Sequence, residues 1–172
     1  MDEIIKLEKK QSGELPFSDF IECYKHQVYQ ICFYMIGKRN EAEEIAQTAF
    51  IEAYMVVRDY NFDKVSSKLF QITVDLVLDW LQERTTSDYT EIEMAESTES
   101  LQKEILQLAV YDRLAIVLRH MVGFSVGEIS DIMQIPISNV RRKIHCSREI
   151  LCKQLNQNSK KYIYLLIPQD KK

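Results

Sequence analysis

The sequence predicts an all-α protein with two small helical domains. Three observations support this fold class. The chain of 172 residues contains only 4 Gly and 3 Pro, the two residues that break helices. Its apolar residues recur mostly at steps of three and four, which is the spacing of one helix face. No alternating β-branched run is long enough for a strand.

Two amphipathic helices begin the first domain. The first, over 17–35, is predicted by seven apolar residues on one stripe, and Gly37 suits its end. The second runs from Asn40, the expected N-cap, to Val57. Its alanines allow close approach to a neighbouring helix, and its acidic first turn complements the helix dipole.

A loop over 59–67 precedes a third helix over 68–84, which is apolar on two sides. One stripe consists of Leu69, Ile72, Leu76 and Trp80, and the other of Phe70, Val74, Val77 and Leu81. A helix that is apolar nearly all round is either deeply buried or covered by a partner. Complete burial is difficult in so small a domain, which we place at residues 1–84.

The composition changes at 85–100, where Thr, Ser, Asp and Glu follow in quick succession. This acidic segment is predicted to be a flexible linker. Residues 101–157 form the second predicted domain, with helices over 101–108, 111–122, 125–133 and 137–155. The tail, 158–172, carries an apolar patch, Tyr162–Ile167, which either packs against the last helix or serves a partner.

The net charge of −4 is unevenly distributed. Residues 1–84 carry 10 basic and 15 acidic side chains, and residues 85–104 carry 1 and 6. Residues 105–172 carry 11 basic and 5 acidic side chains. This asymmetry indicates that only the C-terminal end of the chain meets nucleic acid.

No targeting or membrane segment is expected. Residues 1–10 are charged throughout, and every apolar run is far shorter than the ~20 residues of a membrane helix. The four cysteines form no Cys-x-x-Cys pair, which favours a reducing compartment, and we expect the protein in the cytoplasm. Cys23-x-x-His26 lacks a second half with ligand spacing, so neither a metal site nor a cofactor is predicted.

An enzyme is not expected either. The three histidines lie far apart in the sequence, and neither a Gly-rich phosphate loop nor a nucleophile elbow occurs. The carboxylates fall on predicted solvent faces rather than in a group suited to acid–base chemistry. No catalytic residue is therefore predicted.

The strongest functional pattern is a helix-turn-helix in the second domain. Ser125 and Glu128 have the spacing of a capping box at the start of its first helix. Gln134–Pro136 then interrupts that helix, and the proline fixes the start of the next one. Glycine is common at the turn position of Gln134, where a left-handed Gln costs about 1 kcal/mol.

The last helix combines a buried stripe with a basic outer face. The expected DNA-binding residues are Ser138, Asn139, Arg141, Arg142, Lys143, His145 and Arg148. Arginines bind guanine edges or phosphates, and Ser and Asn add hydrogen bonds. The first residues of a recognition helix reach base edges in the major groove. A charged helix face is often only exposed to solvent. Here the capping box, the turn, the buried stripe and the basic face all favour a DNA-binding helix-turn-helix.

Two motifs carry a resemblance to a known family. One includes Leu118-Arg119-His120-x-x-Gly123-Phe-Ser125-x-x-Glu128-Ile129 and Ile135-Pro136-x-x-Asn139-Val140. The other is Glu41-Ala-Glu43-Glu44-Ile45-Ala46-Gln47-x-Ala49-Phe50. They resemble the minus-35-reading domain and the polymerase-binding helix of extracytoplasmic-function (ECF) sigma factors of the sigma-70 family. The resemblance covers about residues 15–156 of this chain.

The resemblance implies a sigma factor that binds core RNA polymerase, directs promoter-specific transcription initiation and is held in check by an anti-sigma factor. It implies polymerase contacts at Glu43, Glu44, Gln47 and Phe50. Glu43 and Glu44 would also be explained by the helix dipole, which favours acidic side chains near a helix N-terminus. This explanation does not apply to the uncharged Gln47, whose presence favours a contact with polymerase.

The chain departs from the family where relatives engage and melt the minus-10 element. Lys68 and Asp75 replace the usual Trp and Asn, and Trp80-Leu-Gln-Glu-Arg84 replaces a basic run. Fewer cations weaken the attraction to phosphate, and the second apolar stripe lies where DNA approaches in relatives. We expect minus-10 engagement to be weak, unusual in sequence or dependent on an auxiliary protein that covers this stripe.

A smaller departure is Cys146, where relatives commonly carry Arg. DNA binding is expected to survive, because Lys143 and Arg148 keep the helix basic.

Two alternative functions stay open. A sigma-like co-factor that acts only with another subunit would explain the altered melting segment. A helix-turn-helix regulator with an unrelated sensing domain would also explain it, but not the motif over 41–50.

Overall fold

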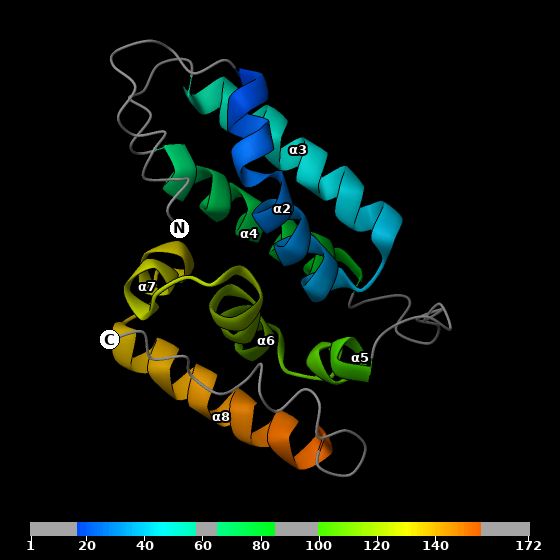
Figure 1. The fold of residues 1–172 in the computed structure, drawn as a ribbon, viewed down its shortest axis with the longest axis vertical. Coiled ribbons are helices and arrows are strands. Elements are labelled where there is room, and N and C mark those ends of the chain that lie inside the picture. The colour runs from blue at the N-terminus through cyan, green and yellow to red at the C-terminus, as the bar shows by residue number, and fades with distance from the viewer. Residues whose placement is uncertain (1–16, 58–64, 85–99, 156–172) are drawn as a thin grey trace.

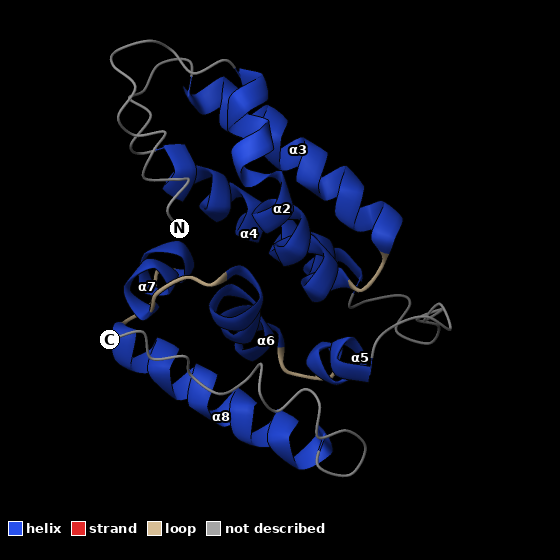
Figure 2. Ribbon diagram, in the orientation of Figure 1, coloured by secondary structure: helices blue, strands red, loops and turns tan. Residues whose placement is uncertain are grey.

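The computed structural model describes residues 17–57, 65–84 and 100–155 (Figure 1). The elements are α2 (Phe17–Ile36), α3 (Arg39–Val57), α4 (Val65–Arg84), α5 (Ser100–Leu106), α6 (Val110–Ile116), η2 (Val117–Val122), α7 (Val126–Met133) and α8 (Ile137–Leu155). Short loops join consecutive helices within each of these ranges, and no strand occurs in them (Figure 2). The all-α prediction is confirmed. The expectations for residues 1–10, for residues 59–64 of the predicted loop, for residues 85–99 of the predicted linker and for the tail lie outside the described residues. Ser100, which is expected at the end of the linker, begins α5.

A tight turn joins α2 to α3. Gly37 has a φ of +80°, and its N–H donates to the carbonyl of Phe33 at 2.8 Å. Glycine suits this left-handed conformation because it has no Cβ. The next helix begins at once, at Arg39, so Asn40 lies inside its first turn. The expectation that Asn40 is the N-cap is therefore wrong.

Helix α4 begins at Val65, three residues before the predicted start at Lys68. The segment Val65–Ser67, expected to be part of a loop, forms the first turn of the helix. Serine side chains satisfy backbone groups near a helix N-terminus, so this turn needs no apolar periodicity to form.

The helix expected over 111–122 consists of α6 followed by one wider π-helical turn, η2. The N–H groups of Gly123 and Phe124 both donate to the carbonyl of Leu118, at 3.1 and 3.0 Å. Gly123 then ends the segment with a φ of +93°. This turn leads directly into the helix-turn-helix of α7 and α8.

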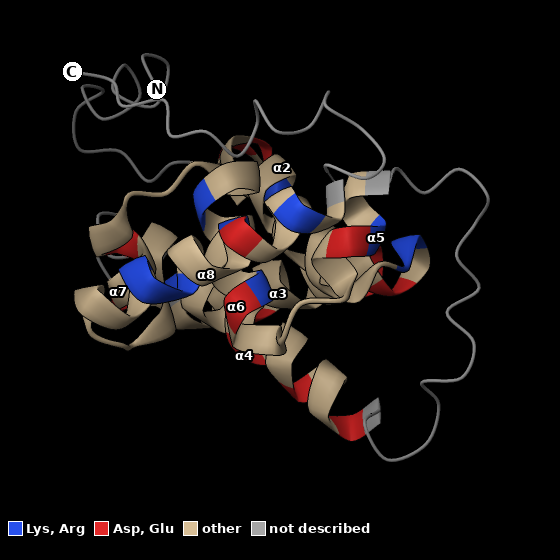
Figure 3. Cartoon of the chain, turned by 90° about the horizontal axis from the view of Figure 1, so that it is seen from below, with Lys and Arg blue, Asp and Glu red and all other residues tan. Residues whose placement is uncertain are grey.

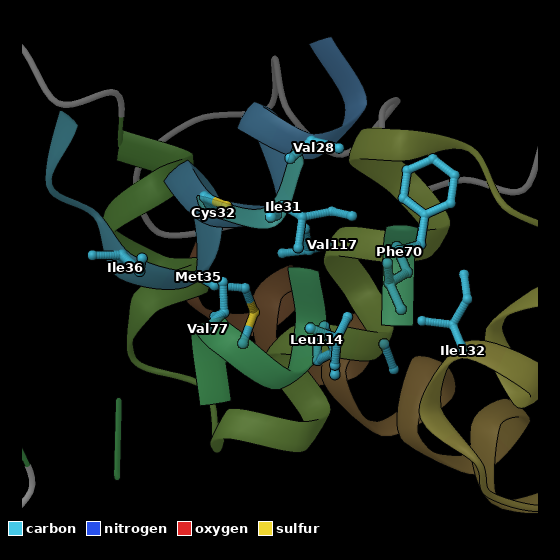
Figure 4. Packing of buried hydrophobic residues seen from close by; sticks show 14 of the residues in the cluster. Val28, Ile31, Cys32, Met35, Ile36, Phe70, Val77, Leu114, Val117 and Ile132 are labelled. Atoms are coloured by element: carbon cyan, nitrogen blue, oxygen red, sulfur yellow. The ribbon is translucent and has the colours of Figure 1, made fainter. Parts of the chain in front are cut away.

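The two halves of the chain, α2–α4 and α5–α8, pack against each other. Helix α2 contacts α5, α6 and η2, and α4 contacts α7. The buried apolar residues of both halves form one cluster, in which Figure 4 shows Val28, Ile31, Phe70, Leu114, Val117 and Ile132. Helix α4 is thus covered by α2 and α3 within its own half and by α7 from the other half.

Candidate nucleic-acid and polymerase interfaces

The helix-turn-helix of α7 and α8 has the predicted local geometry. Ser125 Oγ accepts the N–H of Glu128 at 3.2 Å, and the Glu128 carboxylate accepts the N–H of Ser125 at 2.7 Å. Gln134 has a φ of +53°, which is the left-handed conformation expected at the turn. The Ser130 hydroxyl donates to the carbonyl of Ile135 at 2.6 Å and holds the chain as it leaves this turn.

The recognition helix α8 is fixed by its inner face. Val140, Ser147 and Leu151 are fully buried, and Ile144 is 8% exposed. The Ser147 hydroxyl donates to the backbone carbonyl of Asp112 on α6 at 3.2 Å. This anchoring turns the opposite face of α8 towards solvent, as the predicted stripe requires.

Four of the predicted DNA-binding residues lie exposed on that outer face, namely Ser138, Arg141, Arg142 and His145. Asn139 is half-buried beside them, and His145 Nε2 lies 3.7 Å from a carboxylate oxygen of Glu149 one turn on. The exposed thiol of Cys146 shares this surface. The arrangement offers two guanidinium groups and hydrogen-bonding side chains within the first two to three turns of the helix.

The other two predicted DNA-binding residues are placed differently. Lys143 Nζ forms an ion pair with Asp112 at 2.8 Å and lies 5.9 Å from the centre of the Tyr111 ring. Its ammonium group anchors α8 to α6, so we do not assign it to DNA. Arg148 is half-buried, and its Nε atom has no hydrogen-bond partner among the described residues.

A shallow pocket of about 170 Å³ lies between η2, α7 and α8. Its lining residues are Arg119, His120, Val126, Arg141, Ile144, His145 and Arg148, with no carboxylate among them. Arg119 is held in place because its guanidinium donates to the carbonyl of Phe124 at 2.9 Å. Arginine clusters of this kind bind phosphate, and the first helix of such a motif crosses the DNA backbone.

Sequence reasoning missed this pocket as a site. Arg119 and His120 stand in the quoted motif Leu118-Arg119-His120, but they precede the helix-turn-helix and carried no assigned role. The widened turn η2, which the periodicity did not predict, brings them next to α8.

The predicted polymerase-binding helix is α3, and it offers a polar surface near its start. Glu43, Glu44 and Gln47 are exposed, whereas Phe50 is only 7% exposed. The Phe50 ring packs edge-on against Phe20, with ring centres 6.1 Å apart. Phe50 therefore supports the helix from inside, and a direct contact of its side chain is not proposed.

The same face of α3 continues into apolar residues that sequence reasoning did not single out. Ile51 is 59% exposed and Met55 is 71% exposed, at steps of four from Gln47. A helical spacing of three and four places them on the surface of Glu44 and Gln47. The candidate polymerase surface therefore has an acidic and amide part followed by an apolar part.

The exposed side of α4 becomes acidic towards its C-terminal end. Asp75, Asp79 and Glu83 are all exposed, and Figure 3 shows the acidic positions along the last turns of this helix. Carboxylates repel the phosphates of DNA. This acidic surface of α4 is where the sequence predicts a weak attraction to minus-10 DNA.

Comparisons with known proteins cover both halves. The "Sigma-70 region 2" family matches residues 20–86, and the "Sigma-70, region 4" family matches residues 98–151. The ECF RNA polymerase sigma factor SigW of Bacillus subtilis is 32% identical over 172 aligned positions, which cover 85% of this chain and 92% of SigW. The chain belongs to the ECF sigma factors of the sigma-70 family. It binds core RNA polymerase and directs promoter-specific transcription initiation.

Other similarities extend over nearly the same length. The ECF RNA polymerase sigma-E factor of Escherichia coli is 26% identical over 175 positions, covering 86% of this sigma factor and 91% of the relative. A solved structure of the sigma factor RpoE in complex with the anti-sigma factor NepR, from Bartonella quintana, superposes with a TM-score of 0.70 at 18% identity. It covers 83% of this chain and 98% of that one, which shows a shared fold.

Two further findings concern the described residues. None of their helices has the length and apolar character needed to span a bilayer. No group of three or more His, Cys, Asp or Glu side chains within these ranges is placed to hold a metal ion, and Cys23 lies exposed on α2.

Proposed function

We propose that this sigma factor reads its minus-35 element with the outer face of α8, and that Arg142 is its main base-reading residue. The observation that carries the proposal is the exposure of Arg141, Arg142 and Ser138 on a helix whose opposite face is fixed in the core. In a helix-turn-helix the N-terminal part of the second helix enters the major groove, where arginine forks match guanine edges.

We infer that the pocket beside Arg119 seats a phosphate of the same DNA. A residue that binds phosphate contributes to affinity for every sequence, whereas a residue that reads a base contributes to preference. The two roles are therefore separable by substitution. Lys143 is assigned neither role, because it pairs with Asp112.

Binding of the reconstituted holoenzyme to promoter fragments selected from a random library tests both assignments. We expect Arg142→Ala to cost about 1–3 kcal/mol on the selected promoter and to relax preference at one position. Arg119→Ala should weaken all fragments equally and lower the salt slope by about 1. Lys153→Ala, which removes an exposed charge three turns farther along α8, is the matched control. Unchanged affinity and preference for Arg142→Ala would show that the wrong side of α8 was chosen.

We also propose that Glu43, Glu44 and Gln47 contact core polymerase, together with the apolar residues Ile51 and Met55. Their shared exposure on α3 supports this assignment. Double substitution Gln47→Ala with Met55→Ser should weaken binding of the full chain to core polymerase. Substitution of exposed Glu22 on α2 should not do so.

The organisation of the chain is proposed as a polymerase-binding domain over 1–84, a linker over 85–100, a DNA-binding domain over 101–157 and a tail over 158–172. The family matches over 20–86 and 98–151 support these boundaries. Binding of core polymerase by residues 1–84 alone, without residues 101–157, would test the division.

We propose control by an anti-sigma factor, action in the cytoplasm and no catalytic activity of its own. Membership of the family supports these three statements, and the structural relative RpoE was solved with its anti-sigma factor. A helix-turn-helix regulator with an unrelated sensing domain does not account for the region 2 match.

A sigma-like co-factor that needs a second subunit is the other candidate function, and the acidic end of α4 is the observation that favours it. Transcription with purified core polymerase separates the two candidates. Efficient open-complex formation by the chain and core polymerase, with no other protein added, would exclude a co-factor role.

A further inference from the structure

The pocket between η2, α7 and α8 is lined by two of the three histidines of the chain. His120 comes from η2 and His145 from α8, so the two imidazoles border the pocket from different elements. The third histidine, His26, lies exposed on α2. The pocket to which we assign a DNA phosphate therefore contains side chains whose charge changes near neutral pH.

Three arginines supply the permanent positive charge of this pocket. The bond from Arg119 to the carbonyl of Phe124, at 2.9 Å, uses one of the five N–H donors of the guanidinium and fixes its direction. Arg141 is exposed, Arg148 is half-buried, and no described residue accepts a hydrogen bond from Arg148 Nε. Arg142 lies exposed next to Arg141. Arginine stays protonated in proteins, so its attraction to phosphate does not vary with pH.

Glu149 is the acidic residue that approaches His145. Its carboxylate oxygen lies 3.7 Å from His145 Nε2, and the two side chains are 58% and 71% exposed, so water screens the pair. Glu149 favours a charged imidazole and the neighbouring arginines oppose one, but both effects act with and without DNA. A change in protonation on binding therefore comes from the arriving phosphate.

The acidic side chains on the other elements around the pocket are turned away from it or paired. On α7 the pocket is lined by Val126, and Asp131 lies about 140° farther round that helix. The carboxylate of Glu128 accepts the N–H of Ser125 at 2.7 Å. On α2, which packs against η2, the carboxylate of Glu22 pairs with Lys25 at 2.6 Å.

Protonation changes what an imidazole offers to a phosphate oxygen. A neutral imidazole has one N–H donor and one acceptor nitrogen, whereas a protonated imidazole has two donors and a positive charge. The oxygens of a DNA phosphate only accept, so they bind the protonated form more strongly. An unperturbed histidine changes charge at about pH 6.5. A phosphate in this pocket therefore draws protons onto the histidines when it binds.

We propose that His120 and His145 bind this DNA phosphate in their protonated form, so that promoter binding by this sigma factor takes up protons. The affinity for minus-35 DNA then rises as the pH falls, because the complex holds protons that the free protein does not. Preference among DNA sequences stays the same, since a phosphate contact carries no base information. The inference rests on the proposed phosphate seat beside Arg119, to which it adds two residues and a pH dependence.

Binding of the reconstituted holoenzyme to its promoter fragment at constant salt tests the proposal. Uptake of one proton lowers the affinity roughly fivefold between about pH 6.5 and about pH 8. We expect the double variant His120→Gln with His145→Gln to bind like the parent at the higher pH and to lose this fivefold change. His145→Gln alone, at an exposed position, should reduce the change. His26→Gln is the matched control, since it removes the histidine of α2 and should keep the pH dependence of the parent.

A permanent charge at the same position gives the opposite readout. His145→Arg carries its charge at both pH values, so it should raise the affinity several-fold at the higher pH and leave the affinity at the lower pH nearly unchanged. A purely structural role of His145 would not produce this pattern.

Uncharged backbone linkages locate the phosphate. In the promoter fragment, one phosphodiester at a time is replaced by a methylphosphonate, which carries no charge. We expect the pH dependence of the parent to disappear at one position or at two neighbouring positions. If free inorganic phosphate rather than DNA occupied the pocket, no position would change the pH dependence, and the inference would be wrong.

A pH dependence that persists unchanged in the double histidine variant would also overturn the inference, while the phosphate seat itself would stand. Unchanged affinity of Arg119→Ala would instead refute the proposed phosphate seat, so the two failures are distinguishable.

Discussion

Gly37 offers a direct measure of how tightly the two halves pack. A Cβ built at Gly37 would lie 2.6 Å from Leu106 Cδ1, 3.3 Å from Cδ2 and 3.5 Å from Cγ. The φ of +80° adds backbone strain to this collision. Gly123 has a similar φ of +93°, but a Cβ there meets nothing within 4 Å. The two glycines therefore share the backbone cost and differ in the packing cost.

The expected free energies follow from these two terms. A left-handed non-Gly residue costs about 1–2 kcal/mol, partly offset by a stiffer unfolded chain. Overpacking adds about 1–3 kcal/mol, and the lower end applies because Leu106 is half-buried and its side chain can rotate. We expect Gly123→Ala to lower the free energy of unfolding by about 1 kcal/mol and Gly37→Ala by about 2 kcal/mol.

Urea unfolding followed by circular dichroism measures both values. In a Leu106→Ala background the extra cost of Gly37→Ala should vanish, since the colliding methyl groups are gone. Equal costs for the two glycine substitutions in the parent chain would refute the reasoning. They would mean that the Leu106 side chain does not oppose a Cβ at position 37.

Three further predictions concern buried and strained groups. Arg113→Met should lower the free energy of unfolding by about 2–3 kcal/mol, because the carbonyls of Met35 and Leu108, which accept from Arg113, lose a charged donor. Arg113→Lys should lower it by less, and urea unfolding of both variants measures this order. Burial raises the pKa of the Cys32 thiol from 9.0 to about 12. The unfolded chain then loses the thiol proton at a lower pH than the folded chain does. The free energy of unfolding should therefore fall between pH 9 and pH 12 by roughly 1 kcal/mol per pH unit, and Cys32→Val should remove this slope relative to the parent. Gln134→Gly should stabilise the chain by up to about 1 kcal/mol, since glycine adopts the φ of +53° without strain; a decrease in thermal midpoint would contradict this.

Local features were predictable from the sequence because their hydrogen bonds join residues close together in the chain. The bounds of α8, the capping box of Ser125 and Glu128 and the left-handed Gln134 all follow from spacing within a few residues. The buried stripe of α8 follows from helical period in the same way. The start of α3 was missed because the turn at Gly37, rather than the side chain of Asn40, sets it.

The tertiary structure decided what each exposed or apolar face meets. Lys143 pairs with Asp112 across 31 residues, Gln71 reaches Asp131 across 60, and Arg113 reaches Met35 across 78. Periodicity reports which face of a helix is apolar but carries no information about the partner of that face. The two apolar sides of α4 therefore determined that a cover must exist, and only the fold identified α7 as that cover.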